Sequence, residues 1–500
     1  MSSMEKLNAM RKFGGSITTI GLSDGIIMDF ISRDTKLVEA IDAAYEIFRG
    51  LQDDMPELLA MAEVDQLHHV QADYVNFYSQ DGINPYVSAA ASGPWIITLK
   101  GAVLHDNGGY GMLGFGHAPA AILEAMNQPH VMANIMTPSI SQKRLTTALK
   151  KEIGHTRGNC PFEKFLCLNS GSESVSLGAR LADINAKLRT DPGGPDACKQ
   201  IKKLSLTGGF HGRTDRPAQF SDSTRQIYVN NLATFRDRDN LITVDPNSLE
   251  QLEQVYHYAA NNNIFIEAFF MEPVMGEGNP GHSITPEFYN LARKLTREHG
   301  SLLLVDSIQA GLRAHGVLSI VDYPGFETAD APDLETYSKA LNGGQYPFSV
   351  VAMTAATAAL YRKGVYGNTM TTNPRALDVA CAVLDSLTPE LRENIRNKGH
   401  EFVEKLEQLR VELGDRITGV QGCGLLFSAE LDGSRYKAYG AGSSEEYMRQ
   451  HGINVIHGGE NSLRFTPHFA ITSAEVDMII DATRVALLKG PVKASKSEAA

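Results

Sequence analysis

The sequence predicts a mixed α/β fold, with a large domain built on a mainly parallel sheet flanked by helices and a smaller α+β domain made from N- and C-terminal segments. Between about residues 140 and 375, short apolar runs alternate with helical patterns, and the run at 302–305 is apolar at every position. This alternation is typical of a parallel sheet covered by helices on both faces. Past residue 388 the pattern changes, which predicts the separate smaller domain.

In front of the large domain, apolar residues recur at helical spacing from Thr35 to about Tyr78, around a turn at 53–56. This spacing predicts a helical N-terminal extension. Strand-like runs follow at 95–99 and 102–104, and then a glycine-dense loop at 106–116. The shift in composition there indicates the start of a domain.

The later elements follow from the same rules. A helix is predicted to begin at Thr285-Pro286, where a capping residue precedes a first-turn proline, and to end at Gly300. A capping box at 472–475 predicts the start of the last helix. The remaining predictions are strands at 164–168, 202–206, 265–271, 301–305, 453–456 and 463–465, and a long helix at 389–413.

These patterns divide the chain into five segments. They are a helical extension, the first part of the small domain, the large domain, the C-terminal part of the small domain and a tail that we expect to be disordered: 1–92, 93–140, 141–375, 376–490 and 491–500.

Composition excludes several classes of protein. Lys and Arg total 46 against 58 Asp and Glu, so the net charge of −12 disfavours nucleic acid and anionic lipid as partners. We expect no membrane span and no signal peptide, because no apolar run is long enough. The five cysteines are widely spread, which argues against a disulfide framework and a metal site. The expected location is the cytoplasm.

Four residues directly follow apolar runs, where ligands bind in open α/β sheets: Asn169, Gly208, Glu272 and Asp306. A buried aspartate such as Asp306 is costly to keep ionised unless a cation or a protonated ring nitrogen faces it. A structural ion pair or a helix cap is an equally good reading of such a residue taken alone.

Two loops beyond these strands have the composition of ligand-binding turns. The segment 169–173 precedes a helix with an apolar stripe from Leu177 to Leu188, so its small residues and the helix N-terminus could bind a phosphate. The glycines of 208–212 permit a tight turn that could lay Phe210 against a planar ring. Taken alone, the first loop is more often an ordinary capped helix start, and the second more often contains a buried aromatic.

The lysine of Ser338-Lys339-Ala340 ends another strand-like run and could form a Schiff base in a partly desolvated pocket. Phosphate site, stacking aromatic, carboxylate and lysine therefore occur in this order, each at a strand end. A pyridoxal phosphate site requires this set of residues.

Here the sequence resembles the class III aminotransferases of the fold type I pyridoxal phosphate enzymes, over about 95–490. The matching segments are 101–106 with 116–119, 169–173, 210–213, 272–278, 306–309, 338–341, 368–369 with 373–374, and 463–467.

The resemblance implies a role for each matching residue of the cofactor site. Lys339 would form the Schiff base and Asp306 would keep the pyridine nitrogen protonated. The other cofactor-binding residues would be Gln309 near the ring hydroxyl, Phe210 stacked on the ring, Gly171 and Ser172 at the phosphate, Glu272, and Thr369 at the phosphate of the neighbouring subunit. Shared sites of this kind imply a homodimer.

For the substrate, the resemblance implies that Arg464 binds the α-carboxylate and Arg213 the distal carboxylate, while Glu277 pairs with Arg464 when an amine enters. The expected reaction is amino-group transfer from an amine or amino acid, ω-amines included, to a 2-oxo acid such as 2-oxoglutarate. Racemase, aminomutase and phospho-lyase chemistry remain alternatives, and a catalytically silent scaffold is a remote one.

The chain departs from the family pattern at several places. Ser307 replaces the acid that commonly follows the aspartate, the stretch 342–347 is atypical, and the N-terminal extension is long. A rival dinucleotide motif, Gly-x-Gly-x-x-Gly at 109–114, lacks the expected acid about twenty residues further on. Its match is therefore weak.

Overall fold

The computed structural model describes residues 1–132, 136–237 and 240–493. The part of the expected tail at 494–500 lies outside the described residues. The chain divides into two compact units. The larger comprises 120–396 and 422–426, and the smaller comprises 1–119, 397–421 and 427–500. The larger unit therefore extends beyond the predicted domain of 141–375 at both ends.

A seven-stranded sheet forms the centre of the larger unit, in the order β4-β10-β9-β8-β7-β5-β6. Strands β9, β8, β7, β5 and β6 pair in parallel, whereas β10 is antiparallel to both of its neighbours. The mainly parallel sheet is thus confirmed, with one inserted strand that was not predicted. The bounds are β4 (Lys164–Leu168), β10 (Ser349–Met353), β9 (Leu334–Tyr337), β8 (Leu302–Asp306), β7 (Ile264–Met271), β5 (Gln200–Leu206) and β6 (Leu241–Val244).

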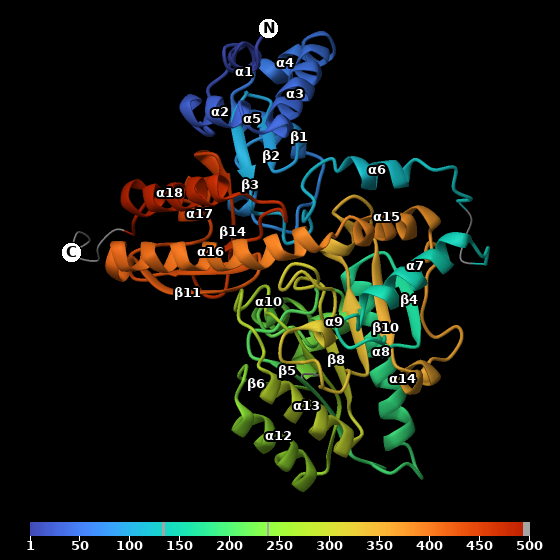
Figure 1. The fold of residues 1–500 in the computed structure, drawn as a ribbon. Helices are drawn as coiled ribbons and strands as arrows, with labels where there is room; N and C mark the ends of the chain where they lie inside the picture. The colour runs from blue at the N-terminus through green and yellow to red at the C-terminus, as the bar shows by residue number, and fades with distance from the viewer. Residues whose placement is uncertain (133–135, 238–239, 494–500) are drawn as a thin grey trace. The chain divides into compact units, whose positions relative to one another are not determined.

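Helices cover both faces of this sheet (Figure 1). On β7, Ala268 and Phe270 belong to the core formed with α8 (Gly171–Thr190), whereas Phe269 faces Phe288 of α13 (Pro286–His299). Successive strand residues point to opposite faces, so α8 and α13 lie on opposite sides. The other helices of the unit are α6 (Ala120–Met126), α7 (Ile140–Glu152), α9 (Asp215–Ala218), α10 (Arg225–Asn231), α11 (Ala233–Asp237), α12 (Leu249–Asn261), α13 (Pro286–His299), α14 (Ala355–Leu360), α15 (Pro374–Asp385) and the start of α16 (Pro389–Leu413).

Gly178 of α8 lets this central helix approach the sheet closely. A Cβ atom at this position would lie 2.4 Å from Cδ1 of Leu304 on β8. Near the end of the helix, Leu188 is 52% exposed rather than buried as its spacing predicted, whereas Ala186 is fully buried. The guanidinium carbon of the next residue, Arg189, lies 5.5 Å from the Phe265 ring of β7.

The smaller unit contains two four-stranded sheets, in the orders β1-β2-β3-β13 and β11-β12-β15-β14. Strand β13 pairs in parallel with β3, so N- and C-terminal segments share one sheet, as predicted. The bounds are β1 (Ser88–Ser92), β2 (Trp95–Thr98), β3 (Val103–Asp106), β13 (Ile453–Asn454), β11 (Ile417–Cys423), β12 (Leu426–Leu431), β15 (Ser462–Phe465) and β14 (Ile456–Gly458); the turn 422–426 is part of the larger unit.

The predicted helical extension is present and packs on this first sheet. Trp95 of β2 is fully buried, contacts Phe30 and donates through Nε1 to Asp34 (2.6 Å). Two helices, α1 and α2, precede the predicted ones. The helices of the unit are α1 (Ser3–Arg11), α2 (Asp24–Ile31), α3 (Thr35–Asp54), α4 (Pro56–Ala60), α5 (Glu63–Gln71), α17 (Ser444–Gln450), α18 (Ser473–Lys489) and the rest of α16. No helix among the described residues is long and apolar enough to cross a membrane.

Candidate active site

Asp306 is the last residue of β8, and three donors fix its carboxylate. Thr336 of β9 donates to Oδ1 (3.1 Å), as does the backbone N–H of Ile308 (3.3 Å), and Nδ1 of His211 donates to Oδ2 (2.8 Å). Asp306 is only 5% exposed. The parallel strands thus bring residues from three separate segments to one carboxylate at their carboxyl ends.

Glu272, which follows β7, joins two neighbouring loops. Its Oε1 accepts from the backbone N–H of Phe210 and its Oε2 from that of Gly276, both over 2.9 Å. Burial raises the pKa of Glu272 to about 7; the nearby His211 opposes this shift and Asp306 adds to it. Glu272 therefore holds the loop that carries Phe210 in place.

Lys339 begins a short 3₁₀ helix, η3 (Lys339–Asn342), with a φ of +42°. A left-handed conformation is uncommon for a residue other than glycine and is found at functional sites. The half-buried side chain donates through Nζ to Oε1 of Gln309 over 2.7 Å. Nε2 of Gln309 in turn donates to the backbone carbonyl of Gly276 (3.4 Å). The structure thus brings the predicted lysine and the predicted glutamine together.

The turn before α8 has the predicted capping geometry. The Ser170 side chain accepts from the Glu173 N–H, and Oε2 of Glu173 accepts from the backbone N–H groups of Asn169 (2.7 Å) and Ser170 (3.2 Å). The first-turn N–H groups of Gly171 and Ser172 have no acceptor within the helix. The N-terminus of α8 therefore presents the backbone N–H groups of Gly171 and Ser172 to an anion.

Two glycines make this turn fit a phosphate group. A Cβ atom at Gly171 would lie 2.8 Å from Cδ1 of Ile308, and one at Gly212 would lie 2.6 Å from Oγ of Ser172. Glycine at both positions leaves room for these neighbouring side chains. The N-terminus of α8 therefore lies beside the turn that follows Asp306. The donors, the carboxylate and the lysine together fit pyridoxal phosphate.

Phe210 and Arg213 lie on the loop after β5. The guanidinium carbon of Arg213 lies 5.5 Å from the centre of the Phe210 ring, and both residues are half-buried. A cation beside an aromatic face is held there while its donors remain available. The contact is compatible with the predicted stacking of Phe210 on the cofactor ring and with the predicted binding of a substrate carboxylate by Arg213.

Thr369 is exposed, and its neighbour Asn368 is bonded to the phosphate turn. Nδ2 of Asn368 donates to Oε1 of Glu173 (3.0 Å), and its Oδ1 accepts from the side chain of Asn169 (3.2 Å). The loop that carries Thr369 is therefore fixed next to Gly171 of the same chain. Whether Thr369 reaches a second subunit stays a prediction.

Arg464 and Glu277 lie in different units. Arg464, on β15 of the smaller unit, is 1% exposed, and its guanidinium carbon lies 5.5 Å from the Tyr110 ring centre. Glu277 is half-buried in the larger unit. Their pairing, and their roles toward a substrate, stay predictions.

Three residues of this region were missed by sequence reasoning: His211, Thr336 and Glu335. His211 lay inside a quoted motif without a role, although a histidine after a strand end was a usable signal. Thr336 and Glu335 are polar residues within a short buried strand, and Glu335 is fully buried. A carboxylate in such a run was the signal that could have found it.

The rival glycine motif at 109–114 has a packing role. A Cβ atom at Gly114 would lie 2.4 Å from the Phe469 ring, and the Gly111 N–H donates to Oγ1 of Thr466 (3.2 Å). The motif also does not open a helix, because α6 begins only at Ala120. The dinucleotide interpretation was therefore wrong.

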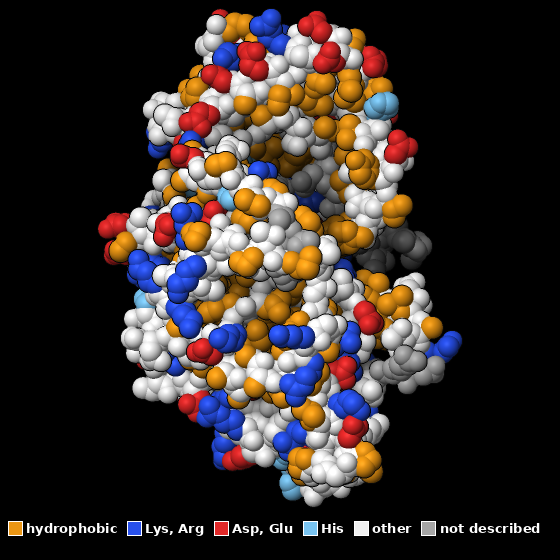
Figure 2. All heavy atoms as spheres, turned by 90° about the vertical axis from the view of Figure 1, so that its right-hand side faces the viewer, with side chains coloured by type: hydrophobic (Ala, Val, Ile, Leu, Met, Phe, Trp, Pro, Cys, Tyr) orange, Lys and Arg blue, Asp and Glu red, His pale blue; other side chains and the backbone are white. Residues whose placement is uncertain are grey.

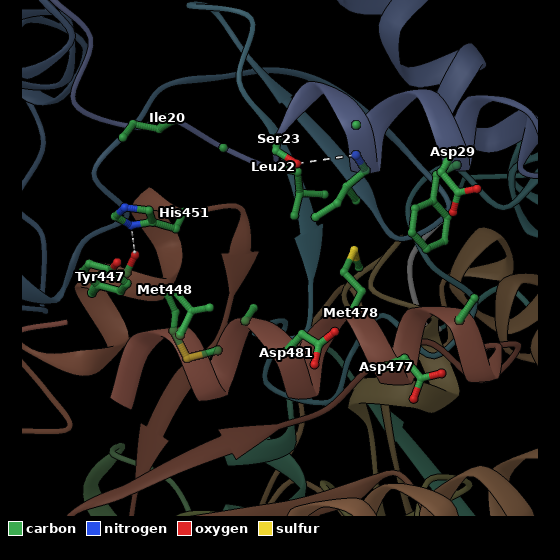
Figure 3. Close-up of a pocket in the computed structure, with 17 residues that line it drawn as sticks. Ile20, Leu22, Ser23, Asp29, Tyr447, Met448, His451, Asp477, Met478 and Asp481 are labelled. Atoms are coloured by element: carbon green, nitrogen blue, oxygen red, sulfur yellow. Dashed lines mark hydrogen bonds between the residues drawn. The ribbon is translucent and has the colours of Figure 1, made fainter. Parts of the chain in front are cut away.

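A cavity of about 690 Å³ lies elsewhere, in the smaller unit, among α2, α17 and α18 (Figure 3). Figure 3 shows His451 and Tyr447 at one end, where Nδ1 of His451 lies 2.7 Å from the Tyr447 carbonyl oxygen. None of the predicted site residues lines this cavity.

Comparison with known proteins identifies the family. Residues 78–487 match the family model described as aminotransferase class-III. The ornithine aminotransferase of Staphylococcus carnosus is 28% identical over 396 residues, which cover 79% of this chain and 92% of that protein.

Solved structures agree in fold. The ornithine aminotransferase of Toxoplasma gondii has a TM-score of 0.72 at 22% identity, covering 87% of this chain and 98% of that one. The acetylornithine aminotransferase of Elizabethkingia anophelis has a TM-score of 0.67 at 24% identity, covering 85% and 99%. With a family match over most of its length, this chain belongs to the class III aminotransferases.

Proposed function

We propose that this chain transfers an amino group from an amine or amino acid, ω-amines included, to a 2-oxo acid such as 2-oxoglutarate, and that Lys339 binds the cofactor covalently. Membership of the family makes the chain a pyridoxal-phosphate-dependent aminotransferase. The residue roles and the substrates are the proposal. The observation that carries it is the 2.7 Å bond between Lys339 and Gln309 beside the fixed carboxylate of Asp306.

When bound, pyridoxal phosphate supplies an electron sink for charge that develops on the substrate carbon. Asp306, held by three donors, would keep a proton on the ring nitrogen. Gly171 and Ser172 would donate backbone N–H groups to the phosphate, and Phe210 would cover one face of the ring. We accordingly assign cofactor binding to the larger unit.

Lys339 would also act as the base. Its amine would hold and move the proton at the substrate carbon when the cofactor and substrate are bound. Its contact with Gln309 limits where Nζ can lie, which favours one proton path. Arg464 and Arg213 would bind the α- and distal carboxylates of the acceptor, and Glu277 would pair with Arg464 when the donor presents an amine.

The experiment is a pair of half-reactions followed by the absorption of the bound cofactor. Ornithine, acetylornithine and simple ω-amines form the donor panel, because the relatives carry those names. Conversion by a donor, and reversal by 2-oxoglutarate, support transfer. Racemisation or elimination without conversion would instead support one of the alternative chemistries.

We also propose a homodimer. Tyr74, Val75 and Phe77 are 79%, 102% and 73% exposed, and Met370 beside Thr369 is 55% exposed. Figure 2 shows groups of exposed hydrophobic side chains, in orange, among the polar and charged side chains of the face drawn there. Exposed apolar surface of this kind marks an interaction site. Light scattering on the holoenzyme tests the dimer, and a fully active monomer would contradict it. A cytoplasmic location stays a prediction.

A further inference from the structure

The serine that replaces the usual acid after Asp306 has a carboxylate as its partner. Ser307 is 1% exposed, and its hydroxyl donates to Oε1 of Glu335 over 2.5 Å. Its backbone N–H donates to the carbonyl oxygen of Thr336 (3.0 Å). An acid is therefore present at this place in the structure, although it comes from β9 and not from the residue after Asp306.

Glu335 is fully buried, and every donor that the structure describes on its carboxylate is neutral. Besides Ser307, the hydroxyl of Ser319 donates to Oε2 and the Ile320 N–H to Oε1 (3.0 Å). Among the described residues, no lysine or arginine forms an ion pair with it. Burial of a carboxylate without a cation partner is costly, so a glutamate at this position of a short buried strand calls for a specific role.

The strand register shows what Glu335 holds. Val305 of β8 lies opposite Glu335, and Asp306 lies opposite Thr336. Two consecutive residues of β9 therefore bind the last residue of β8 and the residue after it. Thr336 bonds to Asp306, and Glu335 bonds to Ser307.

The same two segments are joined a second time at the lysine. Ser307 begins a turn closed by the hydrogen bond from Gly311 N–H to its carbonyl oxygen (2.8 Å), and this turn carries Gln309. Gln309 accepts from Nζ of Lys339, four residues after Glu335. Two hydrogen bonds thus connect the segment 335–339 to the 307–311 turn. Glu335 bonds to Ser307, and Lys339 bonds to Gln309.

We propose that Glu335 is a positioning residue of the active site, which fixes the 307–311 turn through Ser307 so that Gln309 meets Lys339 and Asp306 keeps its orientation. The proposal rests on the proposed roles of Lys339 and Asp306. Glu335 touches neither substrate nor cofactor in this scheme. It acts only through the turn.

The ionisation of Glu335 provides a signature for this role. Burial raises its pKa to about 7, against the hydrogen bonds from Ser307, Ser319 and Ile320. The other titratable groups near it are Tyr337 on its own strand, and Tyr323, Tyr289 and Cys160 from the elements around it. Their pKa values are raised as well, so near neutral pH Glu335 is the group of this cluster that changes charge.

The test compares Ser307→Ala, Glu335→Gln and the double variant as holoenzymes, with Ser92→Ala as the control. Ser92 is also buried and donates to a glutamate, Oε2 of Glu39 (2.9 Å), but lies in the smaller unit. We expect Ser307→Ala and Glu335→Gln each to lower the saturating half-reaction rate about tenfold or more, with little change in the substrate concentration for half-maximal rate. The double variant should lose no more than the worse single variant, because both act through one bond.

A second readout is the pH titration of the bound cofactor's absorption. The wild type should show a spectral change near neutral pH, to which Glu272 also contributes, and Glu335→Gln should reduce this change whereas Ser92→Ala should keep it. Rates within twofold of wild type, additive losses, or an unchanged pH titration would each overturn the proposal. Borohydride labelling of every variant distinguishes failure of the positioning role from failure of the proposed function. Label on Lys339 with unchanged rates refutes the positioning role alone. Label on another lysine refutes the site assignment itself.

Discussion

Nδ1 of His211 donates a hydrogen bond to Oδ2 of Asp306 over 2.8 Å, and neither side chain is more than 5% exposed. Nε2 of the same ring lies 3.2 Å from Oγ of Ser205 on β5. The imidazole therefore links the strand before the Phe210 loop to the carboxylate at the end of β8. A charged group bound in this way gains orientation as well as stabilisation.

Replacing His211 with alanine should reduce activity while the protein still binds cofactor. The loss removes one hydrogen bond to a charged group, a contribution of about 1.5–3 kcal/mol, so the half-reaction rate should fall roughly tenfold to a hundredfold. Stopped-flow measurement of the donor half-reaction checks this. His155→Ala, which removes an exposed histidine bonded to the Glu152 carbonyl, serves as the control. Equal rates for the two variants would mean that His211 is a packing residue.

Lys339→Ala should give a folded protein that no longer binds the cofactor covalently. Loss of the proposed base should lower turnover by about 10²–10⁴-fold. Replacing a residue with a φ of +42° should leave stability nearly unchanged, because alanine meets the same backbone strain. Borohydride reduction followed by peptide mapping checks the assignment, with Lys363→Ala, a residue on the exposed segment after α14, as the control. A reduced adduct on any other lysine would show that Lys339 is not the attachment site.

Three of the predicted site residues stand where a regular pattern stops: Asp306 and Glu272 end apolar runs, and Lys339 follows one. Their position in the chain singled them out, whereas their roles came from the set of motifs and from the family resemblance. Glu335 lies inside such a run and was missed, because a strand pattern does not reveal which side chain across the sheet will receive a buried carboxylate.

Strand direction is the other feature that local pattern does not contain. β10 reads as an ordinary buried strand, yet it runs antiparallel between β4 and β9. Its direction is set by the chain path through η3 and the following turn. The prediction that Leu188 is buried was also wrong, since helical spacing gives one face of α8 but not which residues of that face the rest of the chain covers.

The stability of the protein should depend on Glu335 in a defined pH window. Its pKa is about 7 when folded and near 4.5 when unfolded, so between these values the folded state holds a proton that unfolding releases. The free energy of unfolding should therefore decrease as the pH rises from 4.5 to 7. Glu335→Gln should flatten this decrease. Urea denaturation of both proteins at pH 5, 6 and 7 measures the difference, and parallel pH profiles would contradict the prediction.

Glu475 in the smaller unit should show the opposite dependence. Burial raises its pKa, but His468 (2.8 Å) and His105 (3.0 Å), both bonded to Oε1, together lower it well below 4.5. This stabilisation is present above pH 4.5 and is lost as the pH falls toward the folded pKa. Glu475→Gln should therefore destabilise the protein at pH 7 by about 3–5 kcal/mol.

Urea denaturation at pH 7 measures the effect of Glu475→Gln. Glu446→Gln provides the control, because Glu446 is likewise the third residue of a capped helix, α17, but its carboxylate accepts from the Gly442 N–H and from no histidine of the described residues. A loss no greater than that of the control would mean that the histidines contribute nothing beyond the helix cap.

The acceptor is tested at Arg213, whose guanidinium carbon lies 5.5 Å from the centre of the Phe210 ring. If its guanidinium binds the distal carboxylate of 2-oxoglutarate, Arg213→Ala should cost about 2–5 kcal/mol of binding to the reacting state for that acid. Pyruvate has no distal carboxylate, so its half-reaction should change far less. Arg213→Lys should recover part of the loss, because it restores the charge without the bidentate geometry.

Single-turnover rates against substrate concentration separate the possible outcomes. Removing Arg213 also takes a cation from the face of the Phe210 ring, which should affect every acceptor equally if it matters at all. The ratio of rate constants for 2-oxoglutarate and pyruvate is therefore the informative quantity, because a shared structural effect cancels in it. A ratio that stays constant in Arg213→Ala would assign this arginine to the support of Phe210 and would favour a monocarboxylate acceptor.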